Sequence, residues 1–440
     1  MKTTIILLVQ NKLEQLILCL RSLTDFVEMS EMNLIISDFS SEDGLREWAV
    51  EQVGFTYIYF EKNEATYGKA LNEIINTLDL SGDILVMTPE FLFTPNCIDN
   101  MKRAFLQDID IGAAGPVSNI FALQRVLLKD YEEAVLRGLQ VQNVDTEYTL
   151  GVDGRVVLFR EGIFQRNGGF DEKLQSLQEV MLDFMFRLIC RGNKVVRCRN
   201  AVFWGMLQTA EGQCTRKDRE YLRNKWGMNY FNIMPNLSLI QMIDKNPQDS
   251  FKVLEVGCDC GANLLEIKNY FPKAELYGLE INESAAGVAR HVVNVLQGDI
   301  EQAECDFKVH FDYIVFGDVL EHLHNPLQTI LHCRNLLKES GCIIACIPNV
   351  QHISVVEDLI NGNFTYRDEG LLDRTHIHLF TYKEILSMFE KADYKIENVI
   401  TRELPLEKKQ KELVEKLVEL SEGSEAFMFE TFQYVIRARI

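Results

Sequence analysis

The sequence predicts an α/β protein with two domains. Short apolar runs alternate with amphipathic helical patterns over residues 1–205, and a second alternation of the same kind begins at Phe251. The chain has 440 residues, which is enough for two or three domains of about 100–200 residues each. Hydrophobic residues make up 47% of it and charged residues 25%, so it can fill ordinary cores and is not largely disordered.

A polar and aromatic stretch separates the two alternating regions. It contains one helical pattern, at residues 216–226. We therefore expect a first domain over residues 1–211, a helical connection over 212–248 and a second domain over 249–440. A further charged segment with helical period runs from Leu404 to Ser421, and we expect it to present a solvated face.

The first alternating region predicts a parallel, doubly wound sheet. A strand over Thr3–Val9 is followed by an amphipathic helix over Leu13–Leu23. Further strands are expected at Asn33–Ser37 and Gly82–Met87, and the former runs into a turn rich in Ser, Asp and Gly. Strands that alternate with helices in this way pair in parallel.

In the second region, a buried strand from Val253 runs into a glycine-bearing loop, and a helix follows from about Ala262. Glycines in such a loop let the backbone approach a ligand closely. Further strands are expected at Glu275–Ile281, Val293–Gln297 and Asp312–Gly317. Parallel strands end at one edge of a sheet, where ligands of open α/β sheets bind.

Acidic residues stand at these strand ends. Glu280, nineteen residues after Gly261, can accept hydrogen bonds from both hydroxyls of a ribose. Asp299 can accept one from the exocyclic amine of adenine, and Asp318 ends the fourth strand. The pattern predicts a nucleoside site at this edge.

The second region resembles class I methyltransferases, which use S-adenosylmethionine. The resemblance rests on the Glu-x-Gly-x-x-x-Gly loop, on the acids above and on the Asp-Val-Leu-Glu-His segment 318–322. It also covers a fifth strand at Gly341–Pro348 and a terminal antiparallel pair at Tyr394–Ile400 and Thr431–Ile440. The resemblance implies that the cofactor contacts Glu255, Gly257, Cys258, Gly261, Glu280, Ile281, Asp299, Ile300 and Asp318.

One departure is that Asp259 stands where a glycine is common in the loop. The competing interpretation, a nicotinamide dinucleotide domain, lacks its Gly-x-Gly-x-x-Gly pattern here, and Asp259 would repel a pyrophosphate. Cys258 and Cys260 form a Cys-x-Cys pair without a second pair, so we expect small packed residues and no zinc site.

Histidines are concentrated late in the chain, six of the eight after the fourth strand. Methyl transfer to a hydroxyl needs a base near the acceptor, and histidine is the usual one at neutral pH. We expect His322 to be one catalytic residue, and the resemblance of the segment 372–380 to methyltransferases of surface-glycan genes implies that His376 is the base. Asp318, Glu321 and His322 share a helix face and could instead ligate a metal or cap the helix.

The segment 372–380 resembles methyltransferases found with surface-polysaccharide and O-glycan genes. It follows the fifth strand, where acceptor-binding elements lie in this fold. The resemblance implies a sugar hydroxyl as methyl acceptor, bound in part by Arg374 and His378.

The first region resembles family 2 glycosyltransferases, the inverting GT-A type. Asp38, in a Ser- and Asp-rich turn, matches the acid that contacts the nucleotide base, and Gly68 and Asn72 match the helix start near the nucleotide. Asn167-Gly168-Gly169-Phe170-Asp171-Glu172 matches the acceptor loop, with Asp171 in substrate contact. The resemblance implies a nucleotide sugar and a glycan acceptor as partners.

Two motifs of that family are incomplete. Its metal-binding Asp-x-Asp is replaced by Thr88-Pro89-Glu90, which leaves Glu90 to hold Mg²⁺ or Mn²⁺ together with the nucleotide sugar. Methionine stands where the catalytic base should fall, so Glu179 or Asp183 would serve.

Three functions therefore remain open. The first is a bifunctional enzyme that transfers a sugar and methylates a sugar hydroxyl on the same glycan. The second is a methyltransferase with a non-catalytic glycan-binding module, and the third is a small-molecule methyltransferase unrelated to glycans.

Charge and cysteine content limit the partners. The net charge is −20 and the pI about 4.9, so nucleic acid is not expected, although a local site can still bind a nucleotide sugar. The apolar run Ile5–Val9 is too short to span a membrane and is followed by no small-residue cleavage site, so we expect neither a membrane span nor a signal peptide there. The 11 scattered cysteines indicate reduced thiols in a cytoplasmic protein. The oligomeric state is left open.

Overall fold

The computed structural model describes residues 2–61, 65–78, 80–121, 126–140, 145–206, 216–228, 233–302 and 307–440. The chain forms two compact units, Met1–Met234 and Pro235–Ile440. The boundary that we predicted near residue 212 lies outside the described residues. The connection predicted over 212–248 contributes α8 (Arg216–Trp226) to the first unit and α9 (Leu237–Gln241) to the second.

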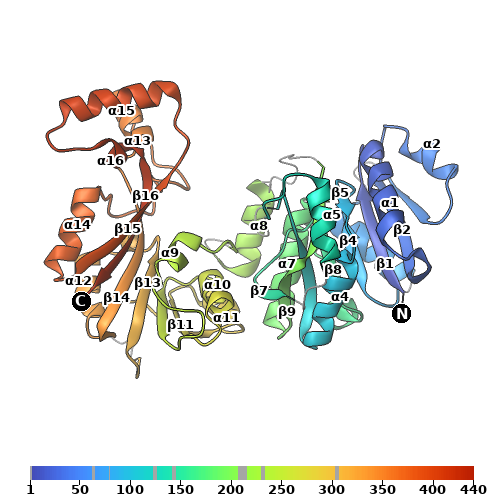
Figure 1. Ribbon diagram of the computed structural model, residues 1–440, viewed down its shortest axis with the longest axis horizontal. Helices are drawn as coiled ribbons and strands as arrows, with labels where there is room; N and C mark the ends of the chain where they lie inside the picture. The colour runs from blue at the N-terminus through green and yellow to red at the C-terminus, as the bar shows by residue number, and fades with distance from the viewer. Residues whose placement is uncertain are drawn as a thin grey trace. The chain divides into compact units, whose positions relative to one another are not determined.

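The first unit is built on one mixed sheet (Figure 1) with the strand order β3-β2-β1-β4-β8-β6-β9-β5 and with β7 paired to β9. The first four strands of this order are parallel, as predicted. Its strands are β1 (Thr3–Val9), β2 (Met32–Phe39), β3 (Thr56–Phe60), β4 (Ile84–Met87), β5 (Phe91–Phe93), β6 (Ile111–Ser118), β7 (Thr146–Thr149), β8 (Val156–Phe159) and β9 (Lys194–Gly205).

The prediction of a wholly parallel sheet is wrong for the rest of this unit. Strand β8 runs antiparallel to both β4 and β6, and β7 and β5 run antiparallel to β9. Strand β8 is buried at every position, and a strand buried on both faces has the same apolar pattern in either direction. Its direction could therefore not be derived from its sequence.

Helices cover the sheet of the first unit. Ile5, Leu7 and Val9 alternate along β1 and share one apolar core with residues of α1 and α4. The helices are α1 (Leu13–Phe26), α2 (Leu45–Val50), α3 (Tyr67–Thr77), α4 (Cys97–Gln107), α5 (Tyr131–Leu139), α6 (Ile163–Asn167), α7 (Leu177–Cys190) and α8, with a 3-10 turn at Met29–Glu31.

The second unit has a sheet of seven strands with the order β12-β11-β10-β13-β14-β16-β15. The first five are parallel, and β16 is inserted antiparallel between β14 and β15. This confirms the Rossmann-like arrangement and its antiparallel terminal pair. The strands are β10 (Lys252–Val256), β11 (Glu275–Glu280), β12 (Asn294–Gln297), β13 (Phe311–Gly317), β14 (Leu337–Pro348), β15 (Lys395–Glu403) and β16 (Thr431–Arg439).

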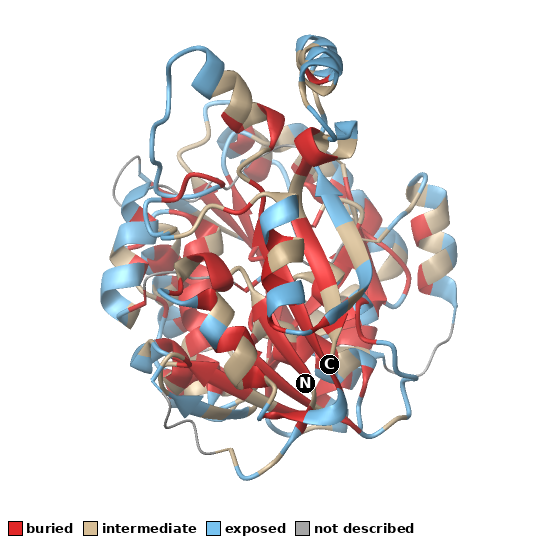
Figure 2. Cartoon of the chain, turned by 90° about the vertical axis from the view of Figure 1, so that its left-hand side faces the viewer, coloured by how far each residue is buried: buried red, intermediate tan, exposed pale blue. Residues whose placement is uncertain are grey.

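Both faces of this sheet are covered. Along β14, Ile343 and Ala345 belong to a core with α12 and α14, whereas Ile344 and Cys346 belong to a core with α9 and α10. Buried residues accordingly follow the strands and exposed ones the outer helix faces (Figure 2). The further helices are α10 (Ala262–Tyr270), α11 (Glu283–Ala289), α12 (Pro326–Cys333), α13 (Ile353–Ile360), α14 (Tyr382–Lys391), α15 (Lys408–Leu420) and α16 (Ala426–Glu430), with a 3-10 turn η2 at Leu320–His322.

Helix α15 confirms the charged helical segment predicted at Leu404–Ser421. It packs beside α13 and α16, where Ile353, Val414 and Phe429 form a small separate core. No helix in the described part of the chain is both long and apolar enough to cross a membrane.

Candidate functional site

The loop after β10 has a left-handed backbone at three positions. Gly257 and Gly261 have φ of +69° and +92°, and Asp259 has φ of +47°. A Cβ at Gly257 would lie 2.6 Å from Cγ2 of Val319, so only glycine fits there. Aspartate is one of the few other residues that adopt this conformation, which explains why the loop tolerates Asp259.

Glu280, at the end of β11, is held by two backbone amides. Its Oε2 accepts a hydrogen bond from Asp259 N at 2.8 Å and its Oε1 accepts one from Asn282 N at 2.8 Å. The side chain is buried and fixed in place. Each carboxylate oxygen has a second lone pair, so both can still accept a hydroxyl of a ribose.

Glu255 lies beneath the loop and is 1% exposed. Its Oε1 accepts a hydrogen bond from Asn263 Nδ2 at 2.6 Å, which ties β10 to the first turn of α10. Burial raises the pKa of Glu255 to about 8, with smaller contributions from the charges of Asp259 and Glu280, so the side chain is largely protonated at pH 7. In this structure Glu255 supports the loop and is covered from solvent.

Cys258 and Cys260 are buried, and burial raises the pKa of both thiols. The expectation of small packed residues is in keeping with this environment. Gly278 faces Cys258, since a Cβ there would lie 2.5 Å from its Sγ.

The two isoleucines expected to contact the cofactor differ in exposure. Ile281 is 64% exposed at the tip of β11, whereas Ile300 is buried in the core that α12 and α14 share with the sheet. Asp299 is half-buried and accepts hydrogen bonds from Glu301 N at 2.9 Å and Gln302 Nε2 at 3.1 Å. Ile281 thus offers an apolar surface beside Glu280, whereas the side chain of Ile300 belongs to the core.

Asp318 follows β13 with φ of +57°, and burial raises the pKa of its carboxyl. Its Oδ1 accepts a hydrogen bond from Nε2 of Gln433 on β16. Gln433 was not predicted, because it lies 115 residues further along the chain and belongs to no motif.

The side chains of Glu321, His322 and His376 meet just beyond β13. Glu321 and His322 lie in η2, and His376 comes from the segment between α13 and α14. The rings of His322 and His376 are 4.9 Å apart between centroids, edge to face. His376 Nδ1 lies 3.1 Å from Leu371 O, and burial lowers the pKa of this histidine, so it is neutral at pH 7. The structure thus brings together the residues expected to activate an acceptor.

The other expected acceptor residues lie nearby in sequence but outside this cluster. His378 lines an open cavity of about 430 Å³ together with residues of α12 and α14. Its Nε2 lies 3.2 Å from His324 O. Arg374 is exposed and pairs with Asp368 at 2.8 Å.

In the first unit, Asp38 and Gly68 have protein partners. Asp38 is fully buried and accepts hydrogen bonds from Ser41 N at 2.8 Å and Tyr57 Oη at 2.5 Å. A Cβ at Gly68 would lie 2.4 Å from Asp171 O, so the close approach that requires glycine is made there by the chain itself.

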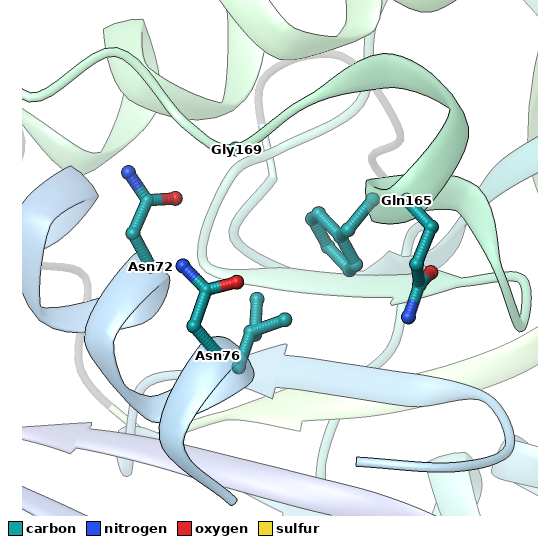
Figure 3. A pocket seen from close by; sticks show the side chains of 6 residues that line it. Asn72, Asn76, Gln165 and Gly169 are labelled. Carbon is teal, nitrogen blue, oxygen red and sulfur yellow. The ribbon is translucent and has the colours of Figure 1, made fainter. Parts of the chain in front are cut away.

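Asn72 holds the Gly-Gly-Phe-Asp-Glu loop. Its Oδ1 accepts from Phe170 N at 2.7 Å and its Nδ2 donates to Phe170 O at 3.0 Å. It also lines a cavity of about 240 Å³, in which Asn72 and Asn76 of α3 face Gln165 and Gly169 (Figure 3). The predicted nucleotide-facing residue is therefore at a polar hollow.

Two of the carboxylates expected to act in sugar transfer, Asp183 and Asp171, are paired with cations. Asp183 is fully buried between Arg187 Nε at 3.0 Å, Lys225 Nζ at 2.7 Å and Trp226 Nε1 at 3.0 Å. Lys225 Nζ also contacts Asp171 at 2.6 Å. Burial acts to raise the pKa of Asp171, but its hydrogen bonds to Lys225 and its neighbours lower it.

Glu90, the expected metal ligand, is ion-paired with Lys12. Burial acts to raise its pKa, yet the Lys12 ammonium holds it below the usual value. In the described residues Glu90 belongs to no group of three metal-ligating side chains. Glu179 is buried on α7, one turn before Asp183, and its Oε2 accepts no hydrogen bond from any described residue.

Comparison with known proteins bears on the second unit. Residues 228–399 match the family model of a methyltransferase domain. The second unit contains a methyltransferase domain of the S-adenosylmethionine-dependent class. A ubiquinone biosynthesis O-methyltransferase of Azoarcus sp. is 36% identical over 99 residues, which are 21% of this chain and 42% of that protein. One from Shewanella sp. is 24% identical over 149 residues, 32% of this chain and 62% of that protein. The chain thus spans about half the length of these curated relatives.

Among solved structures, a methyltransferase of Archaeoglobus fulgidus aligns with a TM-score of 0.36 and 17% identity, over 50% of this chain and 99% of that one. A mannosyltransferase of Pyrobaculum calidifontis, in complex with GDP-Man and Mn²⁺, aligns with a TM-score of 0.38 and 16% identity, over 51% of this chain and 63% of that one. Neither likeness is close enough to assign an activity.

Proposed function

We propose that the second unit transfers a methyl group from S-adenosylmethionine to an oxygen acceptor, a sugar hydroxyl. The observation that carries this proposal is Glu280, buried and fixed by two backbone amides at the tip of β11, with lone pairs left for a ribose. Gly257, Gly261 and Asp299 border the same edge of the sheet. The methyltransferase family match supports this assignment of the cofactor.

The acceptor side of the reaction is assigned to η2 and His376. Burial keeps His376 neutral, and its Nδ1 contact with Leu371 O fixes the tautomer that presents a lone pair on Nε2. Such a nitrogen can take up the hydroxyl proton as the oxygen attacks the methyl group, provided that acceptor and sulfonium are aligned. The open cavity lined by His378 would receive the rest of the acceptor.

Two measurements test this function. Calorimetry with S-adenosylmethionine and S-adenosylhomocysteine should show binding at one site, and mass spectrometry should show a gain of one methyl group on a sugar acceptor. Absence of heat with either ligand, from correctly folded protein, would refute the cofactor assignment. Methylation of phenolic small molecules but of no sugar would refute the glycan acceptor.

For the first unit we propose a non-catalytic module that binds glycan or nucleotide sugar. The specific observation is that Asp183 and Glu90, two of the three carboxylates expected to act as base or metal ligand, are already neutralised by Arg187, Lys225 and Lys12. A carboxylate base or metal ligand needs its lone pairs for the substrate or the ion. The polar hollow at Asn72 and Asn76 is then a binding site without turnover.

The alternative is a bifunctional enzyme with an active sugar transferase. Wild-type protein incubated with sugar nucleotides and Mg²⁺ or Mn²⁺ should neither transfer nor hydrolyse the sugar if the module only binds. Turnover that is lost in Asp183→Asn but retained in the exposed-residue control Asp25→Asn would establish the bifunctional enzyme instead.

A further inference from the structure

We propose that Glu321, His322 and His376 bind a divalent transition-metal ion. One carboxylate oxygen and one ring nitrogen from each histidine all lie within 4.8 Å of one another. The residues come from two segments more than 50 positions apart, η2 and the loop between α13 and α14. Two imidazoles and one carboxylate are the ligand set of many sites for Zn²⁺ and its neighbours in the first transition row.

The histidines are oriented as metal ligands are. His322 Nδ1 lies 3.1 Å from Thr375 O, and His376 Nδ1 lies 3.1 Å from Leu371 O. Each Nδ1–H thus donates to a backbone carbonyl, which leaves a lone pair on Nε2. This second hydrogen bond of a ligating imidazole fixes the tautomer and the ring direction in metal sites.

Glu321 provides an independent observation. Its side chain is 0% exposed, and neither carboxylate oxygen accepts a hydrogen bond from any described residue. The charges of Asp318 and Asp373 also act on it, and no described lysine or arginine is paired with it. A buried carboxylate without a hydrogen bond or counter-charge is unfavourable, and a bound cation would satisfy it.

The backbone holds the two halves of the site together. Glu321 O accepts hydrogen bonds from Ile377 N at 2.8 Å and His378 N at 3.0 Å. The loop that carries His376 is therefore fixed against the residue that carries the carboxylate. The three ligands are preorganised and do not depend on the ion to bring them together.

Three protein ligands leave coordination positions open, as in catalytic metal sites. This step rests on the proposed function. We place the acceptor hydroxyl at an open coordination position of the ion. The ion lowers the pKa of the hydroxyl, and the hydroxyl proton passes to solvent. The oxygen then forms the O–C bond while the C–S bond breaks and its electron pair stays on sulfur, giving S-adenosylhomocysteine. In the metal-bound protein His376 is a ligand, because coordination uses the lone pair that a base would need.

The test is metal binding by the full chain in the absence of methyl donor. Protein freed of metal with a chelator is titrated with Co²⁺, followed by its visible d–d absorption, and with Zn²⁺ in competition with a chromophoric chelator. We expect one equivalent of each ion to bind, and at least a tenfold loss of affinity in His322→Ala, His376→Ala and Glu321→Gln. The matched control is His310→Ala, at the opposite end of β13, which should bind as wild type does.

S-adenosylhomocysteine binding measured on each variant verifies that it is folded. No d–d band with wild type, or equal affinity in wild type and all three variants, would overturn the metal site. Methyl transfer is a separate readout. One equivalent of bound metal without methylation of any acceptor counts against the proposed function alone, whereas full methylation by a protein that binds no metal counts against the metal site alone.

Discussion

Asp183 and Glu90 of the first unit have a different kind of partner from Glu280 and Glu321 of the second. In the first, Asp183 lies among Arg187, Lys225 and the Trp226 indole, and Glu90 is paired with Lys12. In the second, the backbone amides of Asp259 and Asn282 hold Glu280, and the carboxylate of Glu321 accepts no hydrogen bond from the described residues. A cation neutralises an acid and uses its lone pairs, whereas an amide positions it and leaves its charge for a ligand. Motif matching alone treats the two cases alike.

The largest effect is expected for Asp183→Ala. It leaves Arg187, Lys225 and Trp226 without their shared acceptor, and removal of one partner from a buried ion pair costs about 3–5 kcal/mol. The unfolding transition of the first unit should move to lower denaturant, followed by tryptophan fluorescence, because Trp226 reports on this site. Asp25→Ala, an exposed acid of α1, is the control. An unchanged transition would show that Asp183 is not structural, which would return it to the role of base.

The next effect concerns the cofactor. Glu280→Gln replaces one acceptor oxygen by an NH₂ donor that faces a backbone amide. We therefore expect S-adenosylmethionine to bind about 100-fold more weakly, a loss of about 3 kcal/mol of binding free energy. Glu283→Gln, on the neighbouring helix α11 and 68% exposed, is the matched control in calorimetry. Undiminished affinity in Glu280→Gln would contradict the distinction between amide-held and cation-paired acids.

A third prediction uses the pKa of Glu255, raised to about 8 by burial. In the unfolded chain the pKa of Glu255 has its ordinary value of 4.5. Between pH 4.5 and about pH 8 the carboxyl is therefore ionised in the unfolded chain and protonated in the folded chain. The contribution of Glu255 to the free energy of unfolding consequently falls as pH rises through this range. The slope approaches about 1.4 kcal/mol per pH unit. Glu255→Gln keeps the acceptor for Asn263 and removes the titration.

Urea unfolding of wild type and Glu255→Gln should therefore give similar stabilities near pH 5, with the variant gaining steadily toward pH 8. A constant difference across that range would show that Glu255 titrates normally despite its burial.

The smallest effect is expected in the loop. Asp259→Gly relieves a left-handed backbone position and should stabilise the second unit by less than about 1 kcal/mol. Gly261→Ala introduces a Cβ at φ +92° and 3.3 Å from Val292 Cγ2, so it should destabilise by about 1–2 kcal/mol. Thermal unfolding of the pair should show opposite signs. The same sign in both would mean that backbone conformation does not control this loop.

Sequence patterns were sufficient for the strands of the second unit and for the acids at their ends, because each depends on a few consecutive residues. Pairings over long sequence distances were not accessible. Lys225 reaches Asp183 from 42 positions away, and Gln433 reaches Asp318 from 115. From the sequence alone Glu255 is expected to carry a charge, whereas burial in the fold raises its pKa and favours the protonated carboxyl.

The insertion of β16 between β14 and β15 also affects the order of events during synthesis. In the described part of the chain β15 pairs only with β16, so β15 leaves the ribosome before the strand that secures it exists. At about 5–20 residues per second, translation reaches β16 seconds after β15. The same strand supplies Gln433 to Asp318, and the surroundings of Asp318 are therefore completed late, after the loop that follows β10 has had its neighbours for some time.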